Sequence, residues 1–309
     1  MIYRRSIKVP LSRSCKIASF LTNEREFYYR LDVFYDPTWK DKKKRPILLH
    51  FTGAGMKGPY TADSSMVQAW VNEGFIFGCV YYHHYYFMDD TWNHQDKKTS
   101  RFSHAPYTQL PYWRENFSLE HDYHHHLRMR AYMIESALEY LVEHGPKLRF
   151  AKFDIRNIYF TAKSRGGIST IVWSALSECK EWKKYQKFCK GIINSNGFVG
   201  SDTLYSKKAG WRNFKNSMQV LSYYTSNTQH IFYHVYNEKD VGNNDVARRL
   251  MYCIPKSQHT NHYFTNFTHL GHVTNINYNI FAIKALINKK RCYINNELIL
   301  NLEEILNKK

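Results

Sequence analysis

The chain has 309 residues and a mass of 36.9 kDa, and 43% of its residues are hydrophobic, which is enough for a large core and excludes disorder as its main state. No apolar stretch approaches the roughly 18 to 20 residues that a membrane-spanning helix requires. Lysine and arginine outnumber aspartate and glutamate by 44 to 26, giving a formal net charge of +18. Such a charge either favours an anionic partner or is spread over the surface, and the basic runs match no nucleic-acid-binding motif.

Short apolar segments alternate with helical patterns along the chain, an order typical of a mostly parallel sheet with helices on both faces. Polarity partly alternates at 27–35, which predicts an outer strand, and apolar runs predict further strands at 46–51, 74–82, 155–160, 191–194 and 231–236. Helices are predicted at 130–144, 165–176, 278–287 and 297–309. We therefore expect an α/β fold in a single domain spanning residues 1–309.

The segment 83–127 does not fit this alternation. It is rich in tyrosine and holds two tryptophans and eight histidines. A long irregular segment inside a compact domain usually serves as a lid or a pocket wall, and the alternative is a plain surface insertion. We predict a lid or cap insertion.

A serine motif lies where a predicted strand meets a predicted helix. The strand ends in Ala162-Lys163-Ser164-Arg165-Gly166-Gly167, and the helix begins there. A nucleophilic serine has to project from a tight turn, so the residues around it must be small. The backbone N–H of Arg165, at the helix N-terminus, can then stabilise an oxyanion. The motif resembles the nucleophile elbow of the α/β-hydrolase superfamily, with Ala162 in place of the first glycine.

A second motif, His50-Phe51-Thr52-Gly53-Ala54-Gly55, follows a predicted central strand. It is similar to the His-Gly-Gly-Gly oxyanion loop of esterases and lipases, although Ala54 replaces the middle glycine. The resemblance implies that Gly53 or Ala54 supplies a second oxyanion donor, and it does not say which. The alternative is a glycine-rich turn without a site.

The resemblance also implies the order serine, acid, histidine along the chain. Asp240 follows the predicted strand 231–236, where the family has its acid, and Asp245 and Glu238 are alternatives. His272 in the loop Thr268-His269-Leu270-Gly271-His272 resembles the family's catalytic histidine, and His269 is its rival. We expect the triad Ser164, Asp240 and His272.

No cofactor or metal is expected. The six cysteines contain no Cys-x-x-Cys pair, and Cys79 lies in an apolar run typical of a buried thiol. His121, Asp122 and His125 could share one helical face and bind a metal, but no His-Glu-x-x-His motif accompanies them. We favour a solvated or pocket-lining cluster.

Three functions remain open. The first is a serine hydrolase of carboxylic esters. The second is an O-acyltransferase acting on an anionic polysaccharide, because Ser164-Arg165-Gly166-Gly167 is similar to the Ser-Lys-Gly-Gly of some polysaccharide O-acetyltransferases of this fold. The third is a non-catalytic module that binds a polyanion. Since the basic N-terminus lacks the apolar segment of a secretory signal, we expect a cytoplasmic protein.

Overall fold

The computed structural model describes residues 1–10, 28–39, 43–53, 60–81, 119–176, 184–197, 224–240 and 262–288. For residues 28, 29, 119–130, 132 and 165 it describes the backbone alone. All statements below concern these residues.

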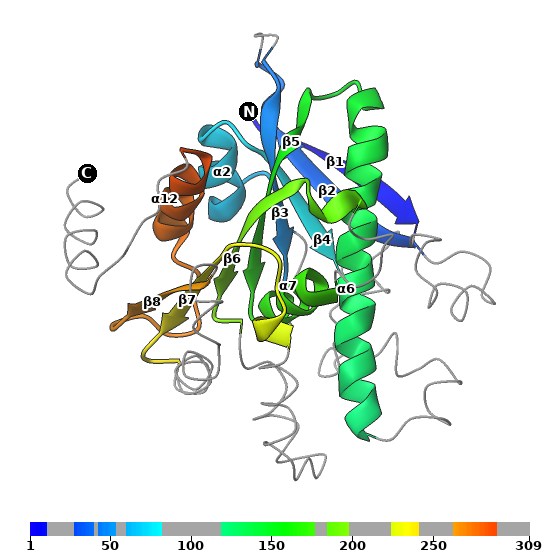
Figure 1. The fold of residues 1–309 in the computed structure, drawn as a ribbon. Helices are drawn as coiled ribbons and strands as arrows, with labels where there is room; N and C mark the ends of the chain where they lie inside the picture. The colour runs from blue at the N-terminus through cyan, green and yellow to red at the C-terminus, as the bar shows by residue number, and fades with distance from the viewer. Residues whose placement is uncertain are drawn as a thin grey trace, which may run out of the picture.

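An eight-stranded sheet forms the centre of the molecule, with strand order β1-β2-β4-β3-β5-β6-β7-β8 (Figure 1). Strands β1 and β2 are antiparallel to their neighbours, and the strands from β4 to β8 run parallel to one another. The strands span β1 Tyr3–Pro10, β2 Tyr28–Tyr35, β3 Arg45–Phe51, β4 Ile76–Tyr81, β5 Phe153–Lys163, β6 Cys189–Ser195, β7 Phe232–Asn237 and β8 His262–Phe267. The predicted α/β class with a mostly parallel sheet is confirmed.

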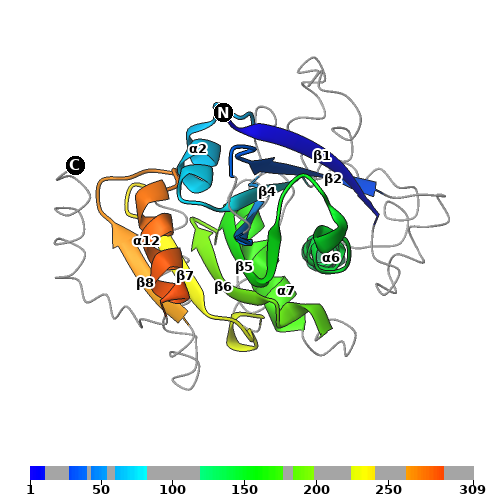
Figure 2. The same cartoon turned by 90° about the horizontal axis from the view of Figure 1, so that it is seen from above.

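Helices cover both faces of the sheet. They are α2 Ser65–Asn72, α6 Leu119–His144, α7 Arg165–Ala175 and α12 Ile276–Ile287, with a short 3₁₀ helix at Gly145–Lys147. Seen from above, α2 and α12 lie on one side of the sheet and α6 and α7 on the other (Figure 2). None of these described helices has both the length and the apolar character that crossing a membrane requires.

Each face has its own apolar core. Trp173 of α7 packs against Phe160 of β5, with ring centroids 4.9 Å apart, in the cluster that includes Ile134 and Leu138 of α6. Trp70 of α2 belongs to the opposite cluster. Central strands buried on both faces read as continuous apolar runs, which is why most of them were predictable.

Three elements were not predicted, namely β1, α2 and β8. Strand β1 has the sequence YRRSIKVP and is mostly exposed, and charged residues and a terminal proline are typical of an edge strand. Strand β8 lies at the other edge and buries His262 and Thr265, so it shows no apolar run. Helix α2 has only eight residues.

Helix α6 begins at Leu119, not near Arg130 as predicted, so residues 119–127 of the predicted insertion are helical. The prediction relied on apolar spacing, which is present only from Ala131 onward. Once a helix is nucleated, each further residue adds a backbone hydrogen bond, so a polar turn can extend it. Residues 83–118 and the predicted helix 297–309 lie outside the described residues.

Candidate active site at the carboxyl edge of the sheet

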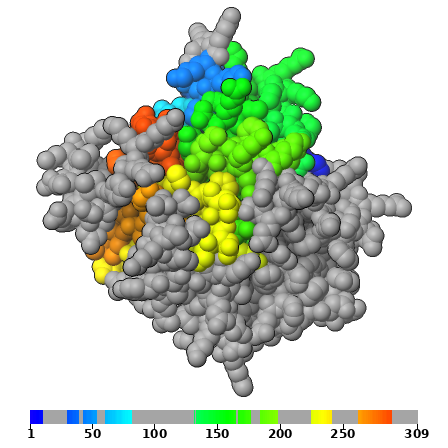
Figure 3. Space-filling model, in the orientation of Figure 1, coloured from blue at the N-terminus to red at the C-terminus, as the bar shows by residue number. Residues whose placement is uncertain are grey.

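The expected site residues come from segments that follow parallel strands. Ser164 follows β5, Asp240 lies three residues beyond β7, and His272 lies in the loop after β8. In open α/β sheets, ligands usually bind at the edge formed by the carboxyl ends of the parallel strands. The segments 224–240 and 262–288 lie side by side in the space-filling view, coloured yellow and orange (Figure 3).

Ser164 occupies a strained turn. Its backbone has φ 54° and ψ −124°, and it is one of two non-glycine residues with positive φ among those described. Its N–H donates to the Ser195 carbonyl at 3.0 Å, and its carbonyl accepts from the Gly167 N–H at 2.9 Å. Such a conformation costs about 1–3 kcal/mol and persists only where its surroundings impose it.

The two glycines after Arg165 allow this turn to form. A Cβ atom at Gly166 would lie 2.2 Å from the carbonyl oxygen of Phe51, on β3. A Cβ atom at Gly167 would lie 1.8 Å from Oδ1 of Asn194, on β6. The sequence Gly166-Gly167 therefore lets the start of α7 approach the ends of the two strands that flank β5.

The expected oxyanion loop lies against the serine. A Cβ atom at Gly53 would lie 2.8 Å from Cβ and 3.4 Å from Oγ of Ser164, so the Gly53 backbone touches the serine side chain. Arg165 is the first residue of α7, so the helix itself provides no acceptor for its N–H. Ala54 lies outside the described residues.

His272 and Asp240 form a hydrogen-bonded pair. Nδ1 of His272 lies 2.5 Å from Oδ2 of Asp240, and the two side chains are 45% and 15% exposed. Of the alternatives considered for the acid, Glu238 is exposed and Asp245 lies outside the described residues. This hydrogen bond to Asp240 is made by His272, the histidine that was preferred to His269.

Lys163, immediately before Ser164, contributes a half-buried ammonium group. Burial lowers the pKa of Lys163, and the negative charge of Asp240 opposes that shift. Sequence reasoning assigned no role to Lys163. Because side chains alternate along β5, Lys163 lies on the face of the sheet opposite Ala162. The serine motif by itself does not show this.

His50, on β3 shortly before the oxyanion loop, is buried. Burial, followed by the charge of Lys163, lowers the pKa of His50 to about 3, so its ring is neutral. Nδ1 lies 2.9 Å from the Thr161 hydroxyl and Nε2 lies 3.3 Å from the Tyr60 hydroxyl. These contacts tie His50 of β3 to β5 and to Tyr60.

The residues that sequence reasoning missed are two asparagines. Asn196 follows β6 and Asn237 is the last residue of β7. Both side chains donate hydrogen bonds to the loop that carries His272. A signal existed in the polar residues that end these apolar strands, Asn194-Ser195-Asn196-Gly197 and Asn237. These polar residues indicate where the strands reach the edge of the sheet, but they do not show which groups the asparagine side chains bind.

Metal binding receives no support from the part of the chain that the structure describes. No group of three or more histidine, cysteine, aspartate or glutamate side chains gathers there. The side chains of His121, Asp122 and His125 lie outside the described set. Cys79 is buried and unbridged, as its apolar surroundings predicted.

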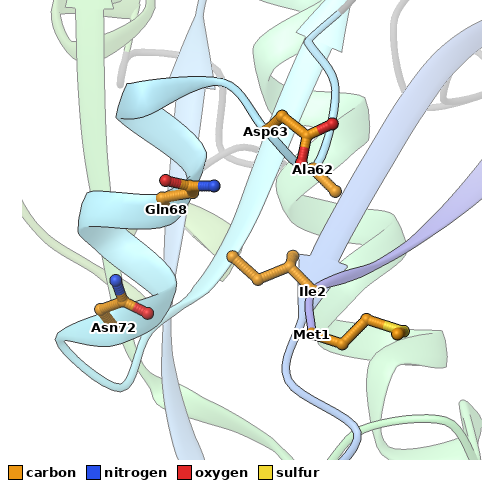
Figure 4. Close-up of a pocket in the computed structure, with 6 residues that line it drawn as sticks. All are labelled: Met1, Ile2, Ala62, Asp63, Gln68 and Asn72. Carbon is orange, nitrogen blue, oxygen red and sulfur yellow. The ribbon is translucent and has the colours of Figure 1, made fainter.

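A separate hollow of about 460 Å³ lies between the N-terminus and α2 (Figure 4). Met1, Ile2, Ala62, Asp63, Gln68 and Asn72 line it. Strand β1 starts beside the amino end of β4, because Tyr3 pairs with Tyr35 and Phe34 pairs with Phe77. The hollow thus contains neither the serine nor the histidine–aspartate pair, and Ile2 and Asn72 place it toward the opposite edge of the sheet.

Comparison with known proteins identifies the fold. No family model matches the sequence, and no curated protein matches it significantly. The structure is similar to esterase B from Lactobacillus rhamnosis, with a TM-score of 0.55 and 12% identity over 93% of this chain and 87% of the other. It is also similar to dienelactone hydrolase from Anabaena variabilis, with a TM-score of 0.53 and 9% identity over 93% and 99% of the two chains.

A third similar structure is the acylaminoacyl peptidase of Pyrococcus horikoshii, with a TM-score of 0.55 and 13% identity, where the match covers 95% of this chain and 43% of the other. At these identities the likeness concerns the fold alone. The strand order, the helices on both faces and these neighbours agree, and the chain has the α/β-hydrolase fold.

Proposed function

We propose that the protein is a serine hydrolase that cleaves carboxylic esters through Ser164, His272 and Asp240. The observation that carries the proposal is the strained backbone of Ser164 at a strand-to-helix turn, on the same edge of the sheet as a hydrogen-bonded histidine–aspartate pair. The similar structures include an esterase and a dienelactone hydrolase, which agrees with ester chemistry.

In the first half of the reaction, Oγ of Ser164 attacks the ester carbonyl carbon and its proton passes to Nε2 of His272. Backbone N–H groups of Arg165 and of Gly53 or Ala54 stabilise the oxyanion. The bond between carbon and the alcohol oxygen then breaks, and His272 returns the proton to the departing alkoxide. The products are an alcohol and an acyl-enzyme on Ser164.

In the second half, His272 takes a proton from water while the hydroxide formed attacks the acyl carbon. Collapse of this intermediate releases the carboxylic acid, and the proton returns to Ser164. Asp240 bonds Nδ1 of His272, which fixes the tautomer with Nε2 as the base and stabilises the imidazolium.

The test is labelling with a fluorophosphonate probe, with mass spectrometry to locate the adduct. We expect modification at Ser164, and loss of both labelling and p-nitrophenyl acetate hydrolysis in Ser164→Ala by several orders of magnitude. Modification of another residue, or of none in the folded protein, contradicts the proposal.

Ser174→Ala is the matched control. Ser174 also contacts a histidine, with Oγ 2.8 Å from Nδ1 of His230, but both residues are buried and burial lowers the pKa of His230 to about 4. Ser174 has no strained turn, so its variant should retain the labelling of the wild type.

The same nucleophile would serve an O-acyltransferase that passes the acyl group to a sugar hydroxyl. The net charge of +18 favours this alternative, because it would attract an anionic glycan. Product analysis with an activated acetyl ester, with and without an anionic polysaccharide, distinguishes the two. Transfer faster than hydrolysis favours the acyltransferase, and binding without turnover in either assay favours a polyanion-binding module.

A further inference from the structure

Packing of the His272 side chain does little to hold the loop that carries it. The loop follows β8 and precedes α12, and residues 268–275 form neither helix nor strand. The His272 side chain is 45% exposed, so packing does not hold the ring. A base in an acyl-transfer triad nevertheless has to stay close to one position, because a displacement of about 1 Å can cost roughly 100-fold in rate.

The buried amide of Asn237 holds the backbone on both sides of His272. Nδ2 of Asn237 donates to the carbonyl of Gly271 at 2.5 Å and to that of Val273 at 3.0 Å. The carbonyl of Asn237 also accepts the N–H of Asp240 at 3.0 Å. One residue at the end of β7 therefore fixes both the acid segment and the histidine loop.

Asn196 connects the same loop to the serine turn. Its Nδ2 donates to the Val273 carbonyl at 2.7 Å. The preceding residue, Ser195, accepts the backbone N–H of Ser164 at 3.0 Å. Asn196 has φ 50°, a conformation that asparagine tolerates better than most residues, and its own N–H donates to Val235 at 2.7 Å.

The chemistry of these amides fits a donor role. Both asparagines are fully buried, and within the described residues the Oδ1 atom of each has no hydrogen-bond partner. A buried polar atom without a partner costs free energy, so a hydrophobic residue would be favoured if these positions only filled space. What the amides supply is three N–H···O bonds to the carbonyls that flank His272.

We infer that Asn196 and Asn237 are positioning residues, which clamp the His272 loop and join it to the segments of Ser164 and Asp240. This inference rests on the proposed function. The clamp acts on His272 through the backbone of Gly271 and Val273, and neither asparagine touches the substrate.

The test uses Asn196→Asp and Asn237→Asp, which keep the side-chain shape and replace the N–H donors by carboxylate oxygen. We expect folded proteins whose rate of fluorophosphonate labelling and whose kcat for p-nitrophenyl acetate fall about 10- to 100-fold, with little change in KM. Amide hydrogen exchange in 268–275 should become faster, while exchange in β3 and β5 stays that of the wild type.

Asn279→Asp is the matched control. Asn279 is equally buried, lies on α12 and bonds the Ser195 hydroxyl, so the variant buries a carboxylate without touching the His272 loop. It should label at a rate close to that of the wild type. If Asn196→Asp or Asn237→Asp fails to fold, Asn196→Gly and Asn237→Ser remove or shorten the donor without adding charge, and the same losses are expected.

The His272→Ala background separates positioning from general damage. If the asparagines act through His272, adding either substitution to His272→Ala lowers the residual labelling of Ser164 by less than about twofold, because their energies are not additive. Full additional losses, or single variants that react like the wild type, overturn the inference alone. A wild-type protein that does not react at Ser164 instead contradicts the proposed function and this role together.

Discussion

Ser164 has a backbone conformation that suits glycine better than serine. Its φ of 54° places an L residue in a disfavoured region, and its N–H and carbonyl are both held by neighbouring segments. This strain lies at the residue proposed to perform the chemistry. Functional sites often keep such strain at a cost in stability, because the activity requires it.

Ser164→Gly should therefore be more stable than Ser164→Ala, by about 1 kcal/mol, because glycine adopts this conformation at no steric cost. Both variants should be inactive. Urea unfolding at one pH measures the difference. Equal stabilities would mean that the turn is not strained.

Gly166 permits the contact between α7 and β3. Gly166→Ala would place Cβ 2.2 Å from a backbone oxygen, so the helix has to shift away from the strand. We expect a loss of about 1–3 kcal/mol in the free energy of unfolding and a large loss of activity. In Gly145→Ala the nearest atom to Cβ is a Phe153 atom at 3.7 Å, an ordinary contact, so this control should retain activity.

At the scale of elements, α6 and α7 are joined through a buried acid. Glu135 of α6 is fully buried and accepts a hydrogen bond from Nε1 of Trp173 on α7 at 2.6 Å. Burial raises the pKa of Glu135 to about 8, although the Trp173 bond opposes the shift. The carboxyl is therefore protonated in the folded protein at neutral pH.

This raised pKa has a definite consequence for stability. Glu135 binds its proton more tightly in the folded state than in the unfolded state, so its contribution is complete below the unfolded pKa of about 4.5. That contribution is lost as pH rises toward the folded value of about 8, with a slope of at most roughly 1.4 kcal/mol per pH unit.

Glu135→Gln should remove this slope, and urea unfolding between pH 5 and pH 9 checks it. The control is Glu143→Gln on the same helix. The Glu143 carboxyl is exposed, and its hydrogen bond from Tyr185 lowers its pKa, so it is ionised in both states over this range. The control should keep the wild-type slope, and a Glu135→Gln variant that also keeps it would contradict the assignment.

For the molecule as a whole, charge is the most unusual property. A net charge of +18 raises the local concentration of anions, and salt screens the attraction over about 10 Å at 0.1 M. One ammonium group also lies within the site, that of Lys163, the residue before the serine.

We expect kcat/KM for an ester that carries a carboxylate to exceed that of its neutral analogue at low salt, and to fall as sodium chloride is added. The neutral ester is the control, because its kcat/KM should change little. Steady-state kinetics between about 20 mM and 500 mM salt measures both. An anionic ester without salt dependence would favour the interpretation that the charge is merely spread over the surface.

The sequence by itself determined the sheet's central strands and the turn at Ser164, because these depend on local patterns. The order of the expected site residues came from the resemblance to the α/β-hydrolase superfamily. Continuous apolar runs mark strands buried on both faces, and Gly166-Gly167 after Ser164 marks a turn where small residues are required. The edge strands β1 and β8 escaped prediction, since an edge carries charge or buried polar pairs instead of apolar runs.

Only the tertiary structure decided which side chains meet. It joined His272 to Asp240, placed Gly53 against Ser164, and brought Asn196 and Asn237 to the carbonyls beside His272. These contacts link residues 32 to 111 positions apart, and they form because parallel strands bring their carboxyl ends to one edge. Local sequence does not encode such contacts, since they depend on how distant strands are placed in the sheet.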